Sequence, residues 1–257
     1  MSIKFVTLNL WHGGILFDDV VRFLKDQDAD IVALQEVFST EDQKLPAHFR
    51  SIESLRKHLD YPYYDFAPAV LDKWPYGNVL NGNAVLSRYP IINRDITFFD
   101  HEFDEKTPRD PFDAQWFAVT PRNLQHVTLD TPDGEVNVFN LQGVWDLDGD
   151  NVSPQRQKMS NTILEKIKGK SHVIVAGDTN AKHTNPVMRA IEERLTNVFG
   201  DSLQSSFNMR RKDNPGYATA VVDMIYMSDD FTIVSRDCPD VDISDHLPLV
   251  VTLGTEK

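Results

Sequence analysis

Several apolar stretches of the sequence end in polar side chains of the types that bind metal ions or phosphate groups. Carboxylate and amide oxygens are the hard ligands that Mg²⁺ and Mn²⁺ prefer, and the sequence has no pattern of cysteines or paired histidines suited to structural zinc. Because the ends of strands in a rigid sheet hold side chains in fixed positions, residues at such ends can together form a metal-dependent site. The residues concerned are Asn9 after FVTL, Gln35 and Glu36 after IVAL, Asp178 and Asn180 after VIVAG, and Asp245 and His246 before LPLVVTL.

Each of these signals is weak when it is taken alone. A glutamate after a strand is usually solvated or caps a backbone group, Gly-Asp is usually a turn, and an asparagine most often makes a local hydrogen bond. The prediction of a site therefore rests on the occurrence of all of them together at the ends of strands.

The elements that must position these residues alternate between strand and helix. Short apolar or alternating runs indicate strands, and capping residues followed by regularly spaced apolar residues indicate helices. Helices and strands alternate in the first half and again after Asn151, which predicts one α/β domain over residues 1–257. The predicted strands are Ile3–Leu8, Ile31–Leu34, Asn83–Leu86, Trp116–Thr120, Leu124–Leu129, Glu135–Leu141, His172–Ala176, Val221–Met227 and Leu249–Leu253. The predicted helices begin at Asp18 as the N-cap, at Ser153-Pro154 and at Asn185-Pro186, with a further helix over Ile52, Leu55 and Leu59.

Three stretches are predicted to lie outside regular structure. Tyr61–Tyr76 is aromatic and rich in proline, and we expect a structured surface loop there. Phe98–Phe112 is acidic and aperiodic, which leaves open whether it is a lid or a plain loop. Residues 146–157 resemble half of a calcium-binding loop, but Asn151 and Gln157 stand where glycine and glutamate are needed, so we expect an acidic turn.

Composition and charge narrow the class of protein. Of the residues, 41% are hydrophobic and 25% are charged, which indicates a globular protein. Lys and Arg number 26 against 39 Asp and Glu, and the net charge of −13 disfavours high-affinity binding to duplex DNA. No run approaches the ~20 apolar residues of a membrane span, and the one cysteine, Cys238, requires no oxidising compartment. We therefore expect a cytoplasmic monomer without a transmembrane segment.

Six motifs follow one another along the chain: FVTLNLWHGG, IVALQEV, GNAVLSRYPI, VIVAGDTN, VVDMIYM and ISDHLPLVV. In this order they resemble the endonuclease/exonuclease/phosphatase superfamily, to which DNase I-like nucleases, inositol-polyphosphate phosphatases and neutral sphingomyelinases belong. The resemblance extends from Ile3 to Leu253. It implies an α/β fold, a four-layer α/β/β/α sandwich of two mixed β-sheets with outer helices, and a site at one end of the paired sheets.

The resemblance also implies roles for the individual residues. Glu36 would be the principal ligand of Mg²⁺ or Mn²⁺. Asn9 and Asp245 would be its companions or the ligands of a second ion. Asp178 would activate the attacking water, and Asn180 would orient the phosphate group.

The last two motifs imply a pairing of a carboxylate with an imidazole. His246 would contact the phosphate or act as an acid or base, held by Asp223. A neighbouring carboxylate fixes the tautomer of an imidazole and raises its pKa, so that a cationic His246 could stabilise the charge of the transition state. Whether Asp178 or His246 is the base stays open.

The sequence departs from the family pattern at two places. Many members have Asn-x-His after the middle hairpin, whereas this chain has Asn140-Leu141-Gln142, so an amide replaces an imidazole that contacts phosphate. Gln142 can donate a hydrogen bond but carries no charge, which predicts a loss of electrostatic stabilisation of about 1–2 kcal/mol. Val221 and Val222 stand before Asp223 where relatives often carry an arginine, which argues against a strongly basic phosphate cradle.

The favoured function is hydrolysis of phosphoesters by a metal-dependent phosphodiesterase, nuclease or phosphatase. The acidic surface favours small molecules, lipid headgroups or short single-stranded nucleic acids as substrates. The alternative is a catalytically silent binding module on the same fold, for which Gln142 is the only supporting feature. Metal-dependent turnover distinguishes the two.

Overall fold

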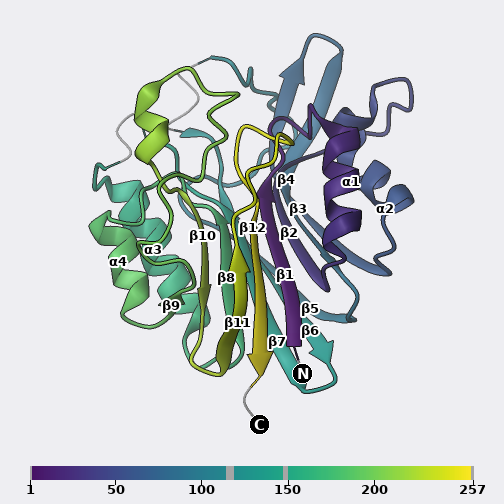
Figure 1. Ribbon diagram of the computed structural model, residues 1–257. Helices are drawn as coiled ribbons and strands as arrows, with labels where there is room; N and C mark the ends of the chain where they lie inside the picture. Colours follow the sequence, from purple (N-terminus) through teal and green to yellow (C-terminus); the bar gives the residue numbers. More distant parts are fainter. Residues whose placement is uncertain (1, 114–118, 147–149, 256–257) are drawn as a thin grey trace.

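A computed structural model describes residues 2–113, 119–146 and 150–255 of the chain (Figure 1). The helices are α1 Phe17–Gln27, α2 Ser51–His58, α3 Pro154–Ile167 and α4 Pro186–Glu192, with 3₁₀ turns at Ala47–Arg50 and Pro215–Thr219. The strands are β1 Ser2–Asn9, β2 Ile31–Ser39, β3 Tyr63–Trp74, β4 Gly77–Ser87, β5 Ile91–Phe98, β6 Asn123–Thr131, β7 Gly134–Gln142, β8 Val173–Asp178, β9 Thr196–Asn197, β10 Asp223–Met227, β11 Phe231–Asp237 and β12 Leu249–Thr255.

These strands form two six-stranded mixed sheets that pack against each other. The first sheet has the order β11-β12-β1-β2-β4-β3 and the second has the order β5-β6-β7-β8-β10-β9. Figure 1 shows α1 and α2 on the outer side of the first sheet and α3 and α4 on the outer side of the second. The structure thus confirms the four-layer α/β/β/α sandwich predicted for this chain.

Strand β1 shows why the layers stack in this way. Its residues Ile3 and Phe5 lie in the core between the two sheets, whereas Val6 and Leu8 pack in the core beneath α1 and α2. A strand that is covered on both faces has no solvent side, so its sequence is an almost continuous apolar run. The polar Asn9 comes at the end of this run, and it is itself only 1% exposed.

The helix starts follow the capping prediction in two cases and depart from it in one. Ser153 Oγ accepts from the backbone N–H of Arg156 at the start of α3, and the Asn185 side chain caps α4 in the same way, with proline at the first position of each helix. The prediction that Asp18 is the N-cap of the first helix is wrong. Helix α1 begins two residues earlier, at Phe17 after the N-cap Leu16, and Asp18 lies in its first turn. A carboxylate there interacts favourably with the positive end of the helix dipole.

The prediction of a surface loop over Tyr61–Tyr76 is also wrong, because most of this stretch is strand β3, paired along its length with β4. Pro68 is tolerated because β3 lies at the edge of its sheet and because the register shifts between Pro68 and Val70. Three further strands, β5, β9 and β11, have no counterpart in the sequence prediction. All three also lie at sheet edges.

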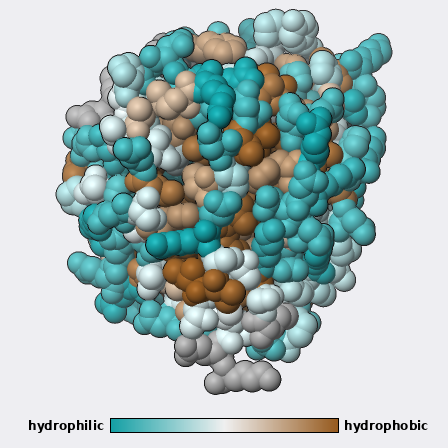
Figure 2. Space-filling model, in the orientation of Figure 1, coloured by the Kyte–Doolittle hydropathy of each residue, from teal (hydrophilic) through white to brown (hydrophobic). Residues whose placement is uncertain are grey.

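Two sequence predictions fall wholly or partly outside the described residues. The strand predicted at Trp116–Thr120 and the acidic turn within residues 146–157 include residues 114–118 and 147–149, which the structure does not describe. Within the described ranges, no helix is long and apolar enough to cross a membrane. Figure 2 shows that the surface on one face is mostly hydrophilic with small apolar patches, in keeping with the net charge of −13.

Gly177 lies in β8, immediately before Asp178. We expect Gly177→Ala to destabilise the protein by about 3 kcal/mol or more, because the alanine would have to adopt a strained backbone conformation and its Cβ would clash with the neighbouring strand. The φ of Gly177 is +137°, and an added Cβ would lie 2.0 Å from the carbonyl oxygen of Leu141 on the neighbouring strand. Urea denaturation measures the effect, and Gly134→Ala is the matched control, because Gly134 has φ +121° and nothing within 4 Å of its added Cβ. Equal losses in the two variants would contradict the steric argument.

Candidate active site

One pocket of about 710 Å³ opens where β1 and β8 end, where β10 and β12 begin and beside Glu36 within β2, at the opposite end of the sandwich from the two termini (Figure 1). Asn9 and Asp223 are buried behind its wall, at 1% and 3% exposure. The structure therefore brings together, around one cavity, side chains from near the two ends of the sequence and from its middle. The predicted site residues that line the pocket are Glu36, Gln142, Asp178, Asn180, Asp245 and His246.

Glu36 leaves the regular alternation of β2 because the strand bulges at this point. The register with β4 shifts between Leu34 and Val37, and Glu36 has a φ of +53°. Its Oε2 accepts from the backbone N–H of His12 at 2.8 Å, and its Oε1 accepts from the amides of Asn9 and Gln142. The bulge thus aims one carboxylate into the pocket and surrounds it with hydrogen-bond donors.

These donors decide the charge of Glu36. Burial raises the pKa of the carboxyl, but the nearby His12 ring, the backbone N–H of His12 and the amide of Asn9 together lower it to about 2. Glu36 is therefore ionised at neutral pH. The preceding residue, Gln35, points instead between the sheets, where its amide donates to Asn140 Oδ1 at 2.7 Å.

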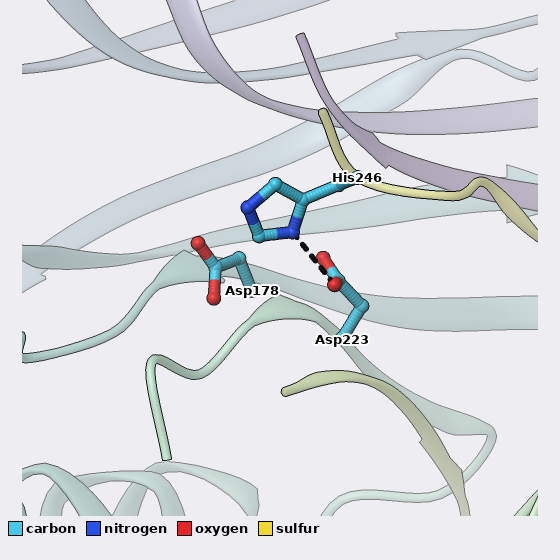
Figure 3. Close-up of side chains that lie close together, drawn as sticks. All are labelled: Asp178, Asp223 and His246. Carbon is cyan, nitrogen blue, oxygen red and sulfur yellow. Dashed lines mark hydrogen bonds and ion pairs between the residues drawn. The ribbon is translucent and has the colours of Figure 1, made fainter. Parts of the chain in front are cut away.

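Asp178, Asp223 and His246 form a buried cluster at the ends of β8 and β10 and just before β12. Asp178 and Asp223 are paired across β8 and β10, and His246 Nδ1 lies 2.8 Å from Asp223 Oδ2. Figure 3 shows both carboxylates beside the same imidazole. One polar atom from each of the three side chains lies within 4.8 Å of the others.

Burial and neighbouring charges both shift the pKa values of His246 and Asp178. Burial lowers the pKa of His246, but the carboxylates of Asp223, Asp178 and Asp245 raise it well above its ordinary value, so the imidazole is cationic at neutral pH. Burial raises the pKa of Asp178 and the negative charges of Asp223 and Glu36 raise it further, against partial compensation by the cationic His246 and the backbone N–H of Asn180. On balance the pKa of Asp178 is raised above its ordinary value.

Asn9 connects the two parts of the site. Its amide nitrogen lies 3.1 Å from Glu36 Oε1 and 3.1 Å from Asp178 Oδ2, and it donates to both. Its Oδ1 accepts from the backbone N–H of Trp11 at 2.9 Å. Asn9 therefore fixes the spacing between Glu36 and Asp178.

Asn180 and Asp245 also line the pocket, and each lies within two residues of a member of the cluster in the sequence. Asn180 has a φ of +51°, donates its backbone N–H to Asp178 Oδ1 at 2.9 Å and donates its amide to the carbonyl of Gly143. Asp245 is 6% exposed and accepts a hydrogen bond from the ammonium of Lys212. These contacts hold both side chains next to the carboxylate and imidazole of the cluster.

Two cations that the sequence motifs do not mark lie in the same pocket. Arg122 donates to Gln142 Oε1, and Gln142 donates in turn to Glu36 Oε1 at 2.8 Å, so a positive charge lies directly behind the amide. Lys212 lies 5.2 Å from the ring centroids of Phe207 and Tyr217 while it contacts Asp245. Both cations lie outside the apolar runs that define the strands, so no sequence signal could have found them.

The donor set of the pocket fits a hard divalent cation. Its carboxylate and amide oxygens match the preferences of Mg²⁺ and Mn²⁺, and no thiol is among the described residues that line it. The rise in the pKa of Asp178 comes in part from the like charges of Asp223 and Glu36. A bound divalent cation would relieve that repulsion.

Asp72 lies in the same pocket, on β3, and we expect Asp72→Asn to stabilise the metal-free protein at pH 8. Asp72 is 4% exposed, and burial raises its pKa to about 6, against partial compensation by the amide of Asn81 and the charge of Arg122. The folded state therefore opposes ionisation, at a cost of up to about 3 kcal/mol that is complete above pH 6 and absent below pH 3.8. Urea denaturation with a chelator at pH 8 and at pH 4 measures the effect. A stabilisation that is equal at the two pH values, or a loss at pH 8, would contradict it.

Comparison with known proteins agrees with this geometry. The profile of the Endonuclease/Exonuclease/phosphatase family matches residues 6–246, and the chain belongs to this family. Comparison with curated protein sequences finds no match.

Solved structures of low sequence identity share the fold. An endonuclease/exonuclease/phosphatase from Beutenbergia cavernae is 19% identical with a TM-score of 0.77, over 99% of this chain and 72% of that one. A mannosyl-6-phosphatase from Bacteroides thetaiotaomicron is 20% identical with a TM-score of 0.70, over 98% and 99%. The catalytic domain of human Nocturnin is 17% identical with a TM-score of 0.70, over 99% and 94%.

Proposed function

We propose that this protein is a divalent-metal-dependent phosphoester hydrolase. The observation that carries the proposal is the buried Asp178–His246–Asp223 cluster, joined through Asn9 to the ionised Glu36 in one pocket. Family membership supports hydrolysis of phosphoesters as the class of reaction. A buried carboxylate of raised pKa beside a cationic imidazole is an arrangement that general acid–base catalysis uses, which supports an enzyme over a binding module.

Glu36 is the proposed principal ligand of the metal ion, and Asp245 is its proposed companion. Asn9 then acts through Glu36 and Asp178, because its amide donates to both carboxylates. A bound Mg²⁺ or Mn²⁺ would polarise a phosphoryl oxygen and stabilise the leaving group. The hard-oxygen donor set supports these two ions over zinc.

Asp178 is the proposed group that takes a proton from the attacking water. Its raised pKa brings a carboxylate closer to the operating pH, where a base is most effective. His246, cationic and held by Asp223, would stabilise the negative charge of the transition state. Asn180, fixed beside Asp178, would orient the phosphate group.

Small phosphoesters are the proposed substrates. The net charge of −13 opposes binding to long polyanions. The pocket of about 710 Å³ is of the size that holds small ligands. Among the structural neighbours, the mannosyl-6-phosphatase has a name that denotes a small phosphoester. A lipid headgroup or a short single strand of nucleic acid would also fit these limits.

The test is hydrolysis of p-nitrophenyl phosphate and bis(p-nitrophenyl) phosphate with Mg²⁺, with Mn²⁺ and with a chelator. We expect turnover that the chelator removes, and the preferred ester distinguishes a monoesterase from a diesterase. Absence of turnover with either ion, together with metal binding measured by calorimetry, would favour the binding module.

A further inference from the structure

A second group of polar side chains lies in the pocket, on the β3–β4 hairpin and at the start of β6, apart from the proposed catalytic residues. Asp72 and Asn81 are diagonal neighbours on the hairpin, and Asn81 Nδ2 donates to Asp72 Oδ2 at 2.9 Å. Arg122 immediately precedes β6 and lines the same cavity. The mechanism proposed above uses none of these three side chains directly.

Each of the three has hydrogen-bonding capacity left over. Within the described part of the chain, the second carboxylate oxygen of Asp72 and the amide oxygen of Asn81 accept no hydrogen bond. Arg122 donates through Nη1 to Gln142 and lines the cavity, and among the described residues nothing accepts a hydrogen bond from its Nη2. A ligand that supplies an acceptor to the guanidinium and a donor to the two oxygens would use this remaining capacity.

The charges in this corner select the kind of group that fits. A second phosphate would be repelled by the carboxylate of Asp72, and an ammonium group would be repelled by the guanidinium of Arg122. A neutral group that both donates and accepts meets neither conflict, and a hydroxyl is such a group. Two adjacent hydroxyls match an acceptor and a donor placed in the same pocket.

We infer that Asp72, Asn81 and Arg122 form a subsite that binds hydroxyl groups on the organic part of the substrate, so that the preferred phosphoesters are those of sugars or other polyols. This inference rests on the proposed function and deepens it. Arg122 links the subsite to the catalytic residues, because it bonds to Gln142, which bonds to Glu36. The hydroxyl-bearing carbons would therefore lie beside the phosphate in a single cavity.

The pocket wall near this subsite also carries aromatic rings. Phe112 lines the cavity, and its ring centroid lies 5.9 Å from that of His12 and 5.1 Å from that of Trp74. The segment that carries Phe112 is held on the hairpin, because Arg109 and β3 exchange backbone hydrogen bonds at Leu71 and Lys73. An aromatic ring beside polar groups suits the apolar C–H face of a sugar ring.

The experiment measures ligand-induced rises in Tm, which need no turnover and are therefore independent of the hydrolysis test. One pair of probes compares the glucose, mannose and galactose 6-phosphates with cyclohexylmethyl phosphate, which has a ring but no hydroxyls. A second pair compares adenosine 5′-monophosphate with its 2′,3′-dideoxy analogue. Each ligand is titrated with Mg²⁺ present against the wild type, Asp72→Asn and Asp110→Asn. Asp110→Asn makes the same change of charge at an exposed position of the pocket rim.

We expect the wild type to bind a hydroxylated probe at least about ten-fold more tightly than its matched partner, since a hydrogen bond to a charged group is lost with the hydroxyl. The pair that shows the preference identifies the source of the hydroxyls, a hexose or a ribose. Asp72→Asn should reduce the preference by about ten-fold, and Asp110→Asn should keep it. No preference in the wild type for either pair, or the same preference in Asp72→Asn, would overturn the inference.

Discussion

Asp178→Asn is expected to lower kcat by about 10²–10⁴-fold, the range that a general base contributes. The change keeps the size of the side chain and removes its capacity to take a proton. The two oxygens of Asp178 accept from Asn9 and from the backbone N–H of Asn180. An asparagine can accept only one of these hydrogen bonds, so the loss of the base is accompanied by a local rearrangement of one donor.

The measurement separates kcat from KM on a p-nitrophenyl ester at saturating Mg²⁺, with folding followed by circular dichroism. Asp104→Asn is the matched control, because Asp104 is exposed and its hydrogen bonds to described residues stay within its own loop, at Lys106 and Thr107. A folded Asp178→Asn variant with kcat within ten-fold of the wild type would remove Asp178 from the proposed mechanism. The attacking water would then need another proton acceptor, because His246 is already cationic at neutral pH.

The strands that were predicted from the sequence and those that were not differ in one physical respect. Central strands such as β1, β2 and β8 are covered on both faces, and their apolar runs record that burial. The strands β3, β5, β9 and β11 occupy the four edges of the two sheets; β3 was predicted as a loop and the other three were not predicted. An edge strand pairs on one side only, so it tolerates Pro68 in β3 and the largely exposed residues of β11.

Convergence of the polar residues follows from the same central strands, although Glu36 lies at a bulge within β2 and not at its end. Asn9, Glu36 and Asp178 each follow an apolar run in a central strand, and the structure places the three around one cavity. The two cations do not follow such apolar runs. Arg122 immediately precedes β6, and Lys212 lies in a segment without regular structure between β9 and β10. Their positions depend on tertiary packing, which residue spacing does not encode.

Gln142 shows how the unknown positions of these cations affected the prediction of lost positive charge at the site. From the sequence, an amide in place of an imidazole implied the loss of a positive charge next to the phosphate. In the structure Arg122 donates to Gln142, so a charge is present one side chain further back. The identity of Gln142 is evident from the sequence, whereas the position of its partner is not.

Glu36→Gln is expected to weaken Mn²⁺ binding by about 100-fold or more and to remove metal-dependent turnover with it, because hard divalent ions bind an ionised oxygen far better than an amide. The substitution removes a carboxylate whose pKa is held at about 2. Calorimetric titration with Mn²⁺ measures the effect without any substrate. Wild-type affinity in the folded variant would assign the metal to other residues of the pocket.

The same variant has an expected effect on stability that is opposite in sign to that of Asp72→Asn. The folded state lowers the pKa of Glu36 from 4.5 to about 2. Its ionised form therefore stabilises the fold above pH 4.5 by up to about 3 kcal/mol, and this contribution is lost as the pH falls toward 2. Without metal at pH 8, Glu36→Gln should destabilise the protein while Asp72→Asn stabilises it.

Urea denaturation of both variants with a chelator tests the pair, and a shift of the same sign in both would contradict the charge states assigned to this pocket. The difference arises because Glu36 faces the donors His12, Asn9 and Gln142, whereas the only hydrogen bond that Asp72 accepts among the described residues comes from Asn81.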